Sequence, residues 1–348
     1  MAKRNKGPGT RRSAPARVQP LGPRRVKSLI DEMAEGREYA SIAGVILDEP
    51  ETALMGELRR GLKDIEAIRG KPCIGYLGHP TAPGAEMNGD DHLPLAEAVL
   101  SVPADAKEVD VFIATAGGSV EVVSKLVDVL RPRFEKVSFL VPAQALSAGT
   151  LWCLSGEEIW MDERAYLGPI DPQVIVADGR TVPLQALLHL LRRIQKDGDE
   201  RLERGEQPQW THIRLLDHMD QKEIGAAMNA SDYLVEQACK YLETYKFREW
   251  QKRSDGAAVT SAYRNERAMT VAKALCDHDK WKNHSHEISR SVLWNELRLQ
   301  VCEPETVSGL QSAMRRLWAL WSYTFGGTTV LKATYTDTYA LIRHKVQP

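Results

Sequence analysis

The chain has 348 residues, of which 43% are hydrophobic, and its formal net charge is −1 with a pI near 6.8. This length and hydrophobic content allow one large buried core, or a core domain with a helical extension. The near-neutral charge gives no overall attraction to nucleic acid or anionic lipid. No run reaches the roughly 18 apolar residues of a membrane span, and the N-terminus lacks the apolar segment of a secretion signal.

The N-terminal segment, residues 1–28, has a composition of its own. It holds nine Lys or Arg residues and no acidic residue, with Gly and Pro interspersed. Such a segment is typical of a disordered tail, either simply solvated or in weak contact with nucleic acid, anionic lipid or a protein partner. Five widely spaced cysteines without a CxxC pair favour the cytoplasm.

Residues 29–68 are rich in charge and helical in pattern, and we expect a helical lead-in that packs on the main domain or on a partner. From residue 69 to 182, apolar strands alternate with amphipathic helices, which indicates parallel βαβ units. The expected elements are a strand at 71–79, a helix at 93–100, a strand at 109–114, a helix at 119–130, a strand at 137–141, a helix at 147–155 and a strand at 158–161.

Beyond residue 182 the pattern becomes helical, and residues 183–348 are expected to form a helical extension that continues the same domain. Helices are expected at 183–205, 215–249, 257–276 and 304–322. Residues 330–342, where Thr and Tyr alternate with apolar residues, favour a closing hairpin or an edge strand. The predicted fold class is therefore α/β, with a helical C-terminal extension.

Two glycine-containing turns follow consecutive predicted strands: TAGGS at residues 115–119 and LSAGT at residues 146–150. Because consecutive parallel strands end at one edge of a sheet, we expect the two turns to lie side by side. The backbone N–H groups of Gly117 and Gly118 are candidates for an oxyanion hole. Ser147, at the start of a helix, is the candidate nucleophile. The alternatives are a tight turn and an N-cap serine.

The two motifs and their spacing resemble the Clp protease and crotonase superfamily. Within it, the stretches ALSAGT (145–150), EIWMDE (158–163) and LGPIDPQ (167–173) are most similar to the serine dehydrogenase proteinase family. The resemblance covers roughly residues 70–300 and is strongest over 109–173. It implies a spiral ββα core, serine-hydrolase chemistry on peptide or protein substrates, and a homo-oligomer that is a trimer or a multiple of one.

The general base is less directly indicated. Clp-type proteins place a histidine near the GPIDP position, and this chain has none there. The serine dehydrogenase proteinases order their triad Ser, Asp, His, which implies Ser147, Asp171 and His284, with His284 as the base and Asp171 orienting it. Asp171 could instead only cap a turn between two prolines, and His284 could be an ordinary surface histidine. His286 is another possible base.

A lysine base is a further alternative, because signal-peptide peptidases of the same superfamily use a Ser/Lys dyad. Lys196 stands at a comparable distance after Ser147, but in a stretch with the pattern of a charged helix face. A zinc site is also conceivable, formed by Cys276, His278, His284 and His286, although the spacing fits no familiar structural zinc site. We therefore expect no metal and no cofactor.

The preferred interpretation is a cytoplasmic serine peptidase in which Ser147 attacks a carbonyl held by an oxyanion hole of Gly117, Gly118 and Ala148. One alternative is a crotonase-like enzyme that polarises an acyl thioester with the same amides. Another is a catalytically inactive scaffold of the same fold. The chain has no GxxxxGK(S/T) motif, so ATP hydrolysis would have to come from another protein.

Overall fold

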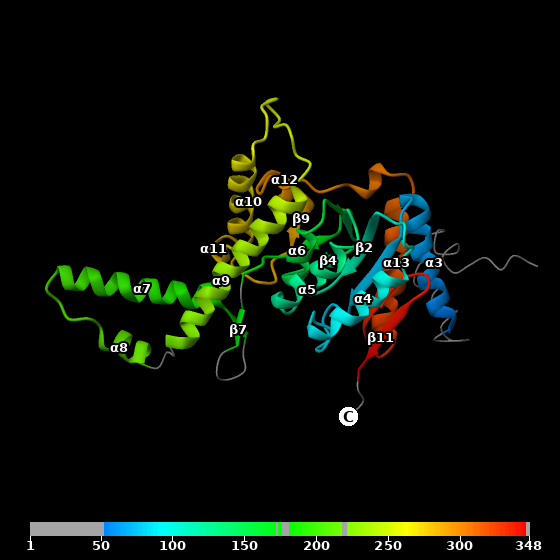
Figure 1. The fold of residues 1–348 in the computed structure, drawn as a ribbon. Helices are drawn as coiled ribbons and strands as arrows, with labels where there is room; N and C mark the ends of the chain where they lie inside the picture. The colour runs from blue at the N-terminus through cyan, green and yellow to red at the C-terminus, as the bar shows by residue number, and fades with distance from the viewer. Residues whose placement is uncertain (1–51, 172, 176–180, 218–220, 346–348) are drawn as a thin grey trace, which may run out of the picture.

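The computed structural model describes residues 52–171, 173–175, 181–217 and 221–345 (Figure 1). The basic tail of residues 1–28 and the lead-in from residue 29 to 51 lie outside the described residues. Over the rest of the lead-in, the expected helix is present as α3 (Thr52–Arg69). No helix in the described part of the chain combines the length and hydrophobicity needed to cross a bilayer.

A six-stranded sheet forms the centre of the molecule, in the order β11-β10-β1-β2-β3-β5. Its strands are β1 (Cys73–Gly78), β2 (Glu108–Ala114), β3 (Lys136–Val141), β5 (Glu158–Met161), β10 (Val330–Tyr335) and β11 (Ala340–His344). Strands β1, β2, β3 and β5 are mutually parallel, whereas β10 runs antiparallel to β1 and pairs with β11 as a hairpin. The α/β fold class is confirmed, and the closing hairpin is present.

Helices follow the strands and dominate the C-terminal half. They are α4 (His92–Ser101), α5 (Val120–Leu130), α6 (Ala148–Cys153), α7 (Leu184–Glu203), α8 (Trp210–Asp217), α9 (Gln221–Tyr241), α10 (Ser261–Leu275), α11 (His278–Trp281), α12 (Arg290–Asn295) and α13 (Leu310–Gly327). Short helical turns are η1 (Gly89–Asp91), the π-helical η2 (Leu242–Lys246) and η3 (Pro304–Thr306). The small strands are β4 (Gln144–Ala145), β6 (Tyr166–Leu167), β7 (Gln173–Ile175), β8 (Thr181–Pro183) and β9 (Ile288–Ser289).

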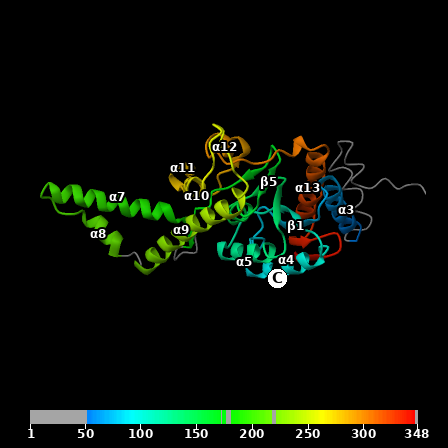
Figure 2. The same cartoon turned by 45° about the horizontal axis from the view of Figure 1, so that its top comes forward.

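The parallel strands are buried on both faces, which is why they read as almost uninterrupted apolar runs. Side chains alternate between the faces: Val111 and Ile113 pack in the core beneath α4, α5, α6, α9 and α10. Phe112 and Leu140 pack on the opposite face, against α3 and α13. Figures 1 and 2 show α3 and α13 side by side on that face, although they come from opposite ends of the described chain.

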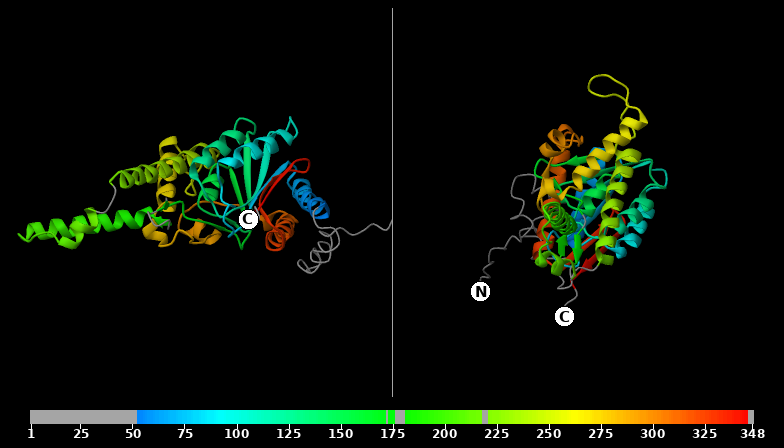
Figure 3. Two further views of the ribbon diagram at one scale, coloured as in Figure 1. Left: turned by 90° about the horizontal axis from the view of Figure 1, so that it is seen from below. Right: turned by 90° about the vertical axis from the view of Figure 1, so that its left-hand side faces the viewer.

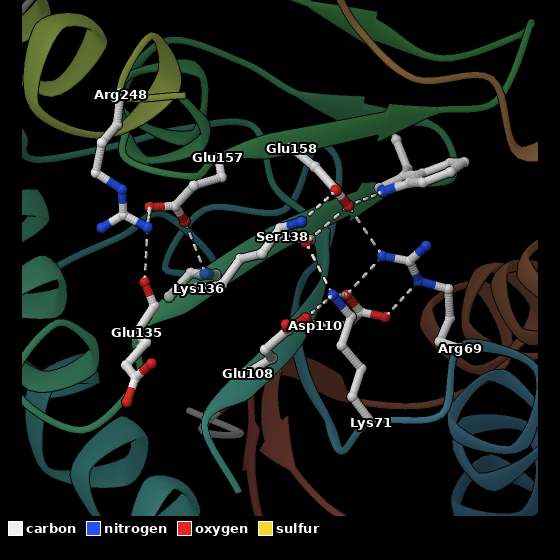
Figure 4. Close-up of polar contacts among 12 residues, drawn as sticks. Arg69, Lys71, Glu108, Asp110, Glu135, Lys136, Ser138, Glu157, Glu158 and Arg248 are labelled. Carbon is white, nitrogen blue, oxygen red and sulfur yellow. Dashed lines mark hydrogen bonds and ion pairs between the residues drawn. The ribbon is translucent and has the colours of Figure 1, made fainter. Parts of the chain in front are cut away.

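At the sheet's amino edge, charged side chains replace apolar ones. Asp110 is fully buried and pairs with Arg69 (2.8 Å) and Lys71 (3.3 Å). Glu158 pairs with Lys136 (2.7 Å) and Arg69 (3.2 Å), and accepts a hydrogen bond from the indole of Trp160 (2.8 Å). Figure 4 shows that these contacts join the C-terminal end of α3 to the first residues of β2, β3 and β5. The network thus links the beginnings of three strands to the end of α3.

Helices α7 and α8, with the first turns of α9, project from the body as a helical arm (Figures 1 and 3). The arm carries much of the exposed apolar surface of the described residues, including Trp210, whose side chain is 74% exposed. No described residue of α8 is buried. Tyr233 and Leu234 of α9, at the base of the arm, reach the cavity described below.

The expected strands and first three helices of the core lie within a few residues of their observed bounds. The helix expected at 215–249 corresponds to the end of α8 and to α9, and residues 218–220 between them lie outside the described residues. The π-helical η2 follows α9 and ends at Lys246, a few residues before the expected end. The helix expected at 304–322 is observed as α13, which begins six residues later, at Leu310. Gly309, whose backbone lies in the left-handed region, is its N-cap residue.

The Glu158 network predicts a specific loss of stability in acid. Burial raises the pKa of Glu158, but hydrogen bonds from Lys136 and Trp160 and nearby positive charge outweigh it and lower the pKa from 4.5 to about 2. Stability linked to this carboxylate is therefore present above pH 4.5 and lost as the pH falls toward 2. We expect Glu158→Gln to cost on the order of 2 kcal/mol of unfolding free energy at pH 7 and progressively less below pH 4.

Denaturant unfolding at pH 7, 4 and 3 measures this difference. Glu135→Gln is the matched control, since that carboxylate is 73% exposed and its ion pair, with Lys107, is itself exposed. An unchanged difference between wild type and Glu158→Gln across this pH range would contradict the prediction.

Candidate active site

The two glycine-containing turns lie side by side, as expected from the sequence. The amide of Thr115 donates to the carbonyl of Gln144 (3.0 Å), and the amide of Leu146 donates back to the carbonyl of Thr115 (3.1 Å). Thr115 and Ala145 thereby form a parallel bridge beyond the ends of β2 and β3. This bridge sets the position of Gly118 relative to Ser147.

Glycine is required in the first turn because the backbones approach too closely for a side chain. Gly117 has φ +98°, and a Cβ there would lie 2.7 Å from the carbonyl oxygen of Leu146. Gly118 has φ +150°, and its Cβ would lie 2.3 Å from the carbonyl oxygen of Met87. Both φ values lie in the region that favours glycine. The turn is therefore pressed between the Ser147 turn and the loop that carries Met87.

Ser147 has a backbone conformation that is rare for a residue with a side chain, with φ +50° and ψ −115°. It occupies the N-cap position of α6, but its side chain makes no capping hydrogen bond. Ser147 is therefore the N-cap residue by position, but its hydroxyl does not cap the helix. Strained backbone of this kind concentrates at functional sites, and in α/β-hydrolases a sharp turn between strand and helix presents a nucleophilic hydroxyl.

Two amides beside Ser147 are available to an incoming oxygen. Among the described residues, neither the N–H of Gly118 nor that of Ala148 donates a hydrogen bond to the protein. Ala148 is the first residue of α6, where the helix leaves its N–H groups unsatisfied. The amide of Gly117 is occupied, because it donates to the hydroxyl of Thr115 (3.1 Å). Gly117 therefore shapes the turn, and Gly118 and Ala148 supply the free donors.

Asp171 is held near this turn by the residues around it. The hydroxyl of Thr150 in α6 donates to the carbonyl of Ala145 (2.7 Å) and accepts from the amide of Gly168 (2.8 Å). The amide of Ile170 donates to the carbonyl of Leu275 at the end of α10 (3.0 Å). The segment from Gly168 to Asp171 thus lies between α6 and the loop that begins after α10.

That loop brings two histidines to Asp171. Nδ1 of His284 lies 2.7 Å from Oδ1 of Asp171, and Nδ1 of His278 lies 3.1 Å from Oδ2. The Asp171 side chain is fully buried, whereas those of His278 and His284 are 14% and 25% exposed. An ionised carboxylate only accepts hydrogen bonds, so each imidazole donates to it from Nδ1; in a neutral imidazole, Nε2 is then an acceptor.

The loop is anchored at both ends and in the middle. Strand β9 pairs with β6, which immediately precedes the segment of Asp171. Asp277 caps α11 by accepting hydrogen bonds from the amides of Asp279 (2.9 Å) and Lys280 (3.2 Å). The indole of Trp281 donates to the carbonyl of Ala274 (2.7 Å). These contacts explain how a histidine distant in sequence comes to Asp171.

A cavity of about 660 Å³ joins these groups. Its polar wall contains Ser147, Asp171 and His284, together with Gly118 and Ala148. Its other lining residues are Glu86, Ala116, Ser119, Val120, Glu121, Leu151, Ile170, Ala230, Tyr233 and Leu234. Hydrogen bonds from the Ser119 hydroxyl and the backbone lower the pKa of Glu121, so one side of the cavity carries a negative charge beside a largely apolar wall.

The other sequence candidates lie elsewhere. Lys196 lies on α7, and its side chain is 78% exposed. Its ammonium group is 3.8 Å from the carboxylate of Glu200, and the residue is not part of the cavity lining. His286 stacks on Trp281, with ring centroids 5.1 Å apart. Within the described ranges, no three His, Cys, Asp or Glu side chains are grouped to hold a metal ion. Burial raises the pKa of the Cys276 thiol, which opposes the thiolate form that zinc binds.

His278 is the residue whose place sequence reasoning did not find. The sequence offered it only as a member of the zinc alternative, yet it contacts the carboxylate that also contacts His284. The available signal was the concentration of histidines between residues 278 and 286. That signal does not say which of them faces Asp171.

A strand-end turn with two free amides, a strained serine and a His–Asp pair thus line one cavity at the edge of the sheet. Residues 52–202 match the family model of the ClpP-like SDH-type serine proteinases, which confirms the resemblance inferred from the sequence. This match supports a serine peptidase at the level of the family. It contains Ser147 and Asp171, and ends before His284.

The chain is also similar to two uncharacterized proteins of Methanocaldococcus jannaschii. It is 33% identical to MJ0137 over 116 residues, which is 33% of this chain and 40% of that protein. It is 29% identical to MJ1495 over 146 residues, which is 42% of this chain and 48% of that protein. The chain therefore spans less than half the length of either relative.

Solved structures give more distant similarities. A variant of the 1510-N membrane-bound stomatin-specific protease aligns with a TM-score of 0.36 and 12% identity, over 62% of this chain and 74% of that one. A variant of ClpP1 from Listeria monocytogenes aligns with a TM-score of 0.24 and 17% identity, over 29% of this chain and 57% of that one.

The close approach at Gly118 predicts that this turn tolerates no side chain. Gly118→Ala is expected to lower the free energy of unfolding by about 2–4 kcal/mol, because it adds a clash with Met87 to a strained φ. Gly89→Ala is the matched control in the neighbouring η1 turn, since a Cβ there meets nothing within 4 Å. Denaturant unfolding measures both, and equal stability of the two variants would show that the turn can relax.

Proposed function

We propose that this protein is a serine peptidase with Ser147 as nucleophile, His284 as general base, Asp171 as its orienting carboxylate, and the amides of Gly118 and Ala148 as the oxyanion hole. The observation that carries the proposal is that all five residues line one cavity, in which the serine is strained and both amides are free of partners in the described part of the chain. The family match over residues 52–202 supports the same chemistry.

The mechanism follows from these positions. Nε2 of His284 takes the proton of the Ser147 hydroxyl as its oxygen attacks the carbonyl carbon of the scissile peptide bond. The carbonyl oxygen becomes an oxyanion that accepts hydrogen bonds from Gly118 and Ala148, and Asp171 stabilises the imidazolium. His284 then protonates the leaving amine. Water releases the acyl group by the same steps, with His284 again as base.

The surroundings of the cavity suit a peptide. Val120, Leu151 and Leu234 give an apolar wall for a substrate side chain, and the cavity is within the usual size range of small binding sites, about 300–1,000 Å³. The homo-oligomer, the cytoplasmic location and any contact made by the basic tail stay predictions from the sequence.

A fluorophosphonate probe tests the nucleophile and the base together. We expect wild type to be labelled, Ser147→Ala to lose labelling, and His284→Ala to react at least about 100-fold more slowly, because the base contributes about 10²–10⁴-fold. Lys196→Ala is the control and should react like wild type, since its ammonium is exposed and remote from the cavity lining.

Labelling that survives Ser147→Ala would assign another nucleophile. Labelling lost in Lys196→Ala but kept in His284→Ala would replace the triad with a Ser/Lys dyad. A folded wild type that is never labelled would favour the acyl-thioester or scaffold alternatives.

His278 is proposed as a positioning residue, because it binds the Asp171 oxygen that His284 leaves free and does not line the cavity. His278→Ala is expected to lower kcat/KM by about tenfold, as the loss of one hydrogen bond to a charged group suggests. His278→Asn, whose amide can still donate to Asp171, should restore most of that loss. Kinetics across pH with a peptide substrate would distinguish the variants, and a larger loss in His278→Ala than in His284→Ala would exchange their roles.

A further inference from the structure

A second cavity of about 660 Å³ lies away from the proposed active site. Its lining includes Glu157, which immediately precedes β5, so this cavity is at the amino edge of the sheet, whereas Ser147 follows the carboxyl end of β3. The remaining lining comes from η2 and the chain after it, from α10, and from the extended segment 298–302. The proposed peptidase mechanism uses none of these residues.

Positive charge dominates this cavity. Five of its lining side chains are basic and two are acidic: the basic ones are Lys246, Lys252, Arg253, Arg267 and Arg298. Of the two acids, Glu157 is already neutralised from outside this set, by Arg131 (2.9 Å) and Arg248 (2.9 Å). Figure 4 shows Arg248 beside Glu157. Because Glu157 is paired with arginines outside the lining, it does not offset the five basic side chains, and the positive charge of the cavity exceeds the simple difference of five and two.

Four of the five basic groups have no anionic partner among the described residues. Within the described ranges, no carboxylate lies within 4.0 Å of the charged nitrogens of Lys246, Lys252, Arg267 or Arg298. Lys246 donates to the backbone carbonyl of Glu157 (3.1 Å), and Arg267 donates to the carbonyl of Leu297. The nearest carboxylate to Arg253 is Asp255 at 3.9 Å, and its buried Nε has no hydrogen-bond partner among the described residues.

The backbone at Arg298 is also unusual. It has φ +52°, one of three such values at non-glycine residues in the described part of the chain, and Ser147 is another. The Arg267 guanidinium binds the carbonyl of Leu297 just before it, so one cavity residue holds the turn that presents another. A strained turn that places a cation at the mouth of a basic cavity is consistent with a binding role.

We propose that this cavity binds a phosphate-bearing small molecule, with Lys246, Arg253, Arg267 and Arg298 as its phosphate ligands. Uncompensated like charges around one volume repel each other, and a bound anion removes that repulsion. A guanidinium group binds two oxygens of a phosphate at once. Several donors around one cavity suit the three terminal oxygens of a phosphate better than the two oxygens of a carboxylate. Burial lowers the pKa of Lys246, and an adjacent phosphate would favour its charged form.

The chemistry does not distinguish inorganic polyphosphate from a nucleotide, so both probes are needed. Calorimetric titration of the full chain with tripolyphosphate and with ATP, at constant ionic strength, is expected to give saturable binding of one ligand per chain. Tighter binding of ATP would assign an organic phosphate that also contacts Phe247 or Trp250 of the lining. Equal binding of both would assign the phosphate groups alone.

The combined variant Lys252→Gln with Arg298→Gln changes the two exposed basic residues at the mouth. It is expected to weaken binding by about tenfold or more, because it removes the charge-assisted contact of one proposed ligand, Arg298, and a second positive charge, that of Lys252, from the cavity lining. Arg298→Lys should weaken it less. Lys107→Gln, which removes an exposed charge elsewhere, and Ser147→Ala should bind like wild type.

Three results would overturn the proposal: no saturable heat with either phosphate at millimolar concentration, unchanged affinity in the combined variant, or binding of an acidic peptide without binding of phosphate. Because Ser147→Ala serves as a control, none of these results depends on whether the protein is a peptidase.

Discussion

The reciprocal backbone hydrogen bonds of Thr115 with Gln144 and Leu146 are the contact on which the proposed site depends. They extend the parallel pairing of β2 and β3 past the ends of the strands, where most parallel pairs diverge into loops. Because these bonds hold the two turns together, Gly118 and Ala148 line the same cavity, and among the described residues their amide N–H groups donate no hydrogen bond. This close pairing of the turns restricts the sequence, because a side chain at Gly117 or Gly118 would clash with the neighbouring backbone. The strain at Ser147 is thus supported by ordinary sheet geometry rather than by a special set of side chains.

The second half of the site is assembled differently. Asp171 is carried by the core, but both histidines that contact it come from a loop after α10, held by one hydrogen bond at Ile170 and by the pairing of β6 with β9. Both oxygens of a fully buried carboxylate are occupied, each by a different imidazole. A buried charge needs partners, and here the partners also fix its orientation. The loop and the core therefore stabilise each other through the residue that the proposed mechanism uses.

How much of this the sequence could predict differs along the chain. Residues 109–161 combine buried strands with glycine turns, and local pattern alone located the strands, the two turns and Ser147. Asp171 and His284 were reached only through family resemblance, because no local pattern indicates that a loop so distant folds back. The sequence does not separate the role of His278 from that of its neighbours. Which histidine faces Asp171 depends on the capping of α11 and on the contact of Trp281 with Ala274. The basic cavity also arises from packing among segments that are not adjacent in sequence.

The core beneath one face of the sheet is built from the two ends of the described chain. Helix α3 packs on α13, and β10 pairs with β1, where Tyr335 occupies the space that a side chain at Gly75 would fill. Trp321 of α13 donates to that tyrosine hydroxyl (3.0 Å). The segment that carries the family likeness, residues 52–202, is consequently not a module that could be excised or grafted. Cut at its boundaries, it would lose α13 and the β10–β11 hairpin, expose to water the part of the sheet face that α13 covers, and leave Asp171 without either imidazole.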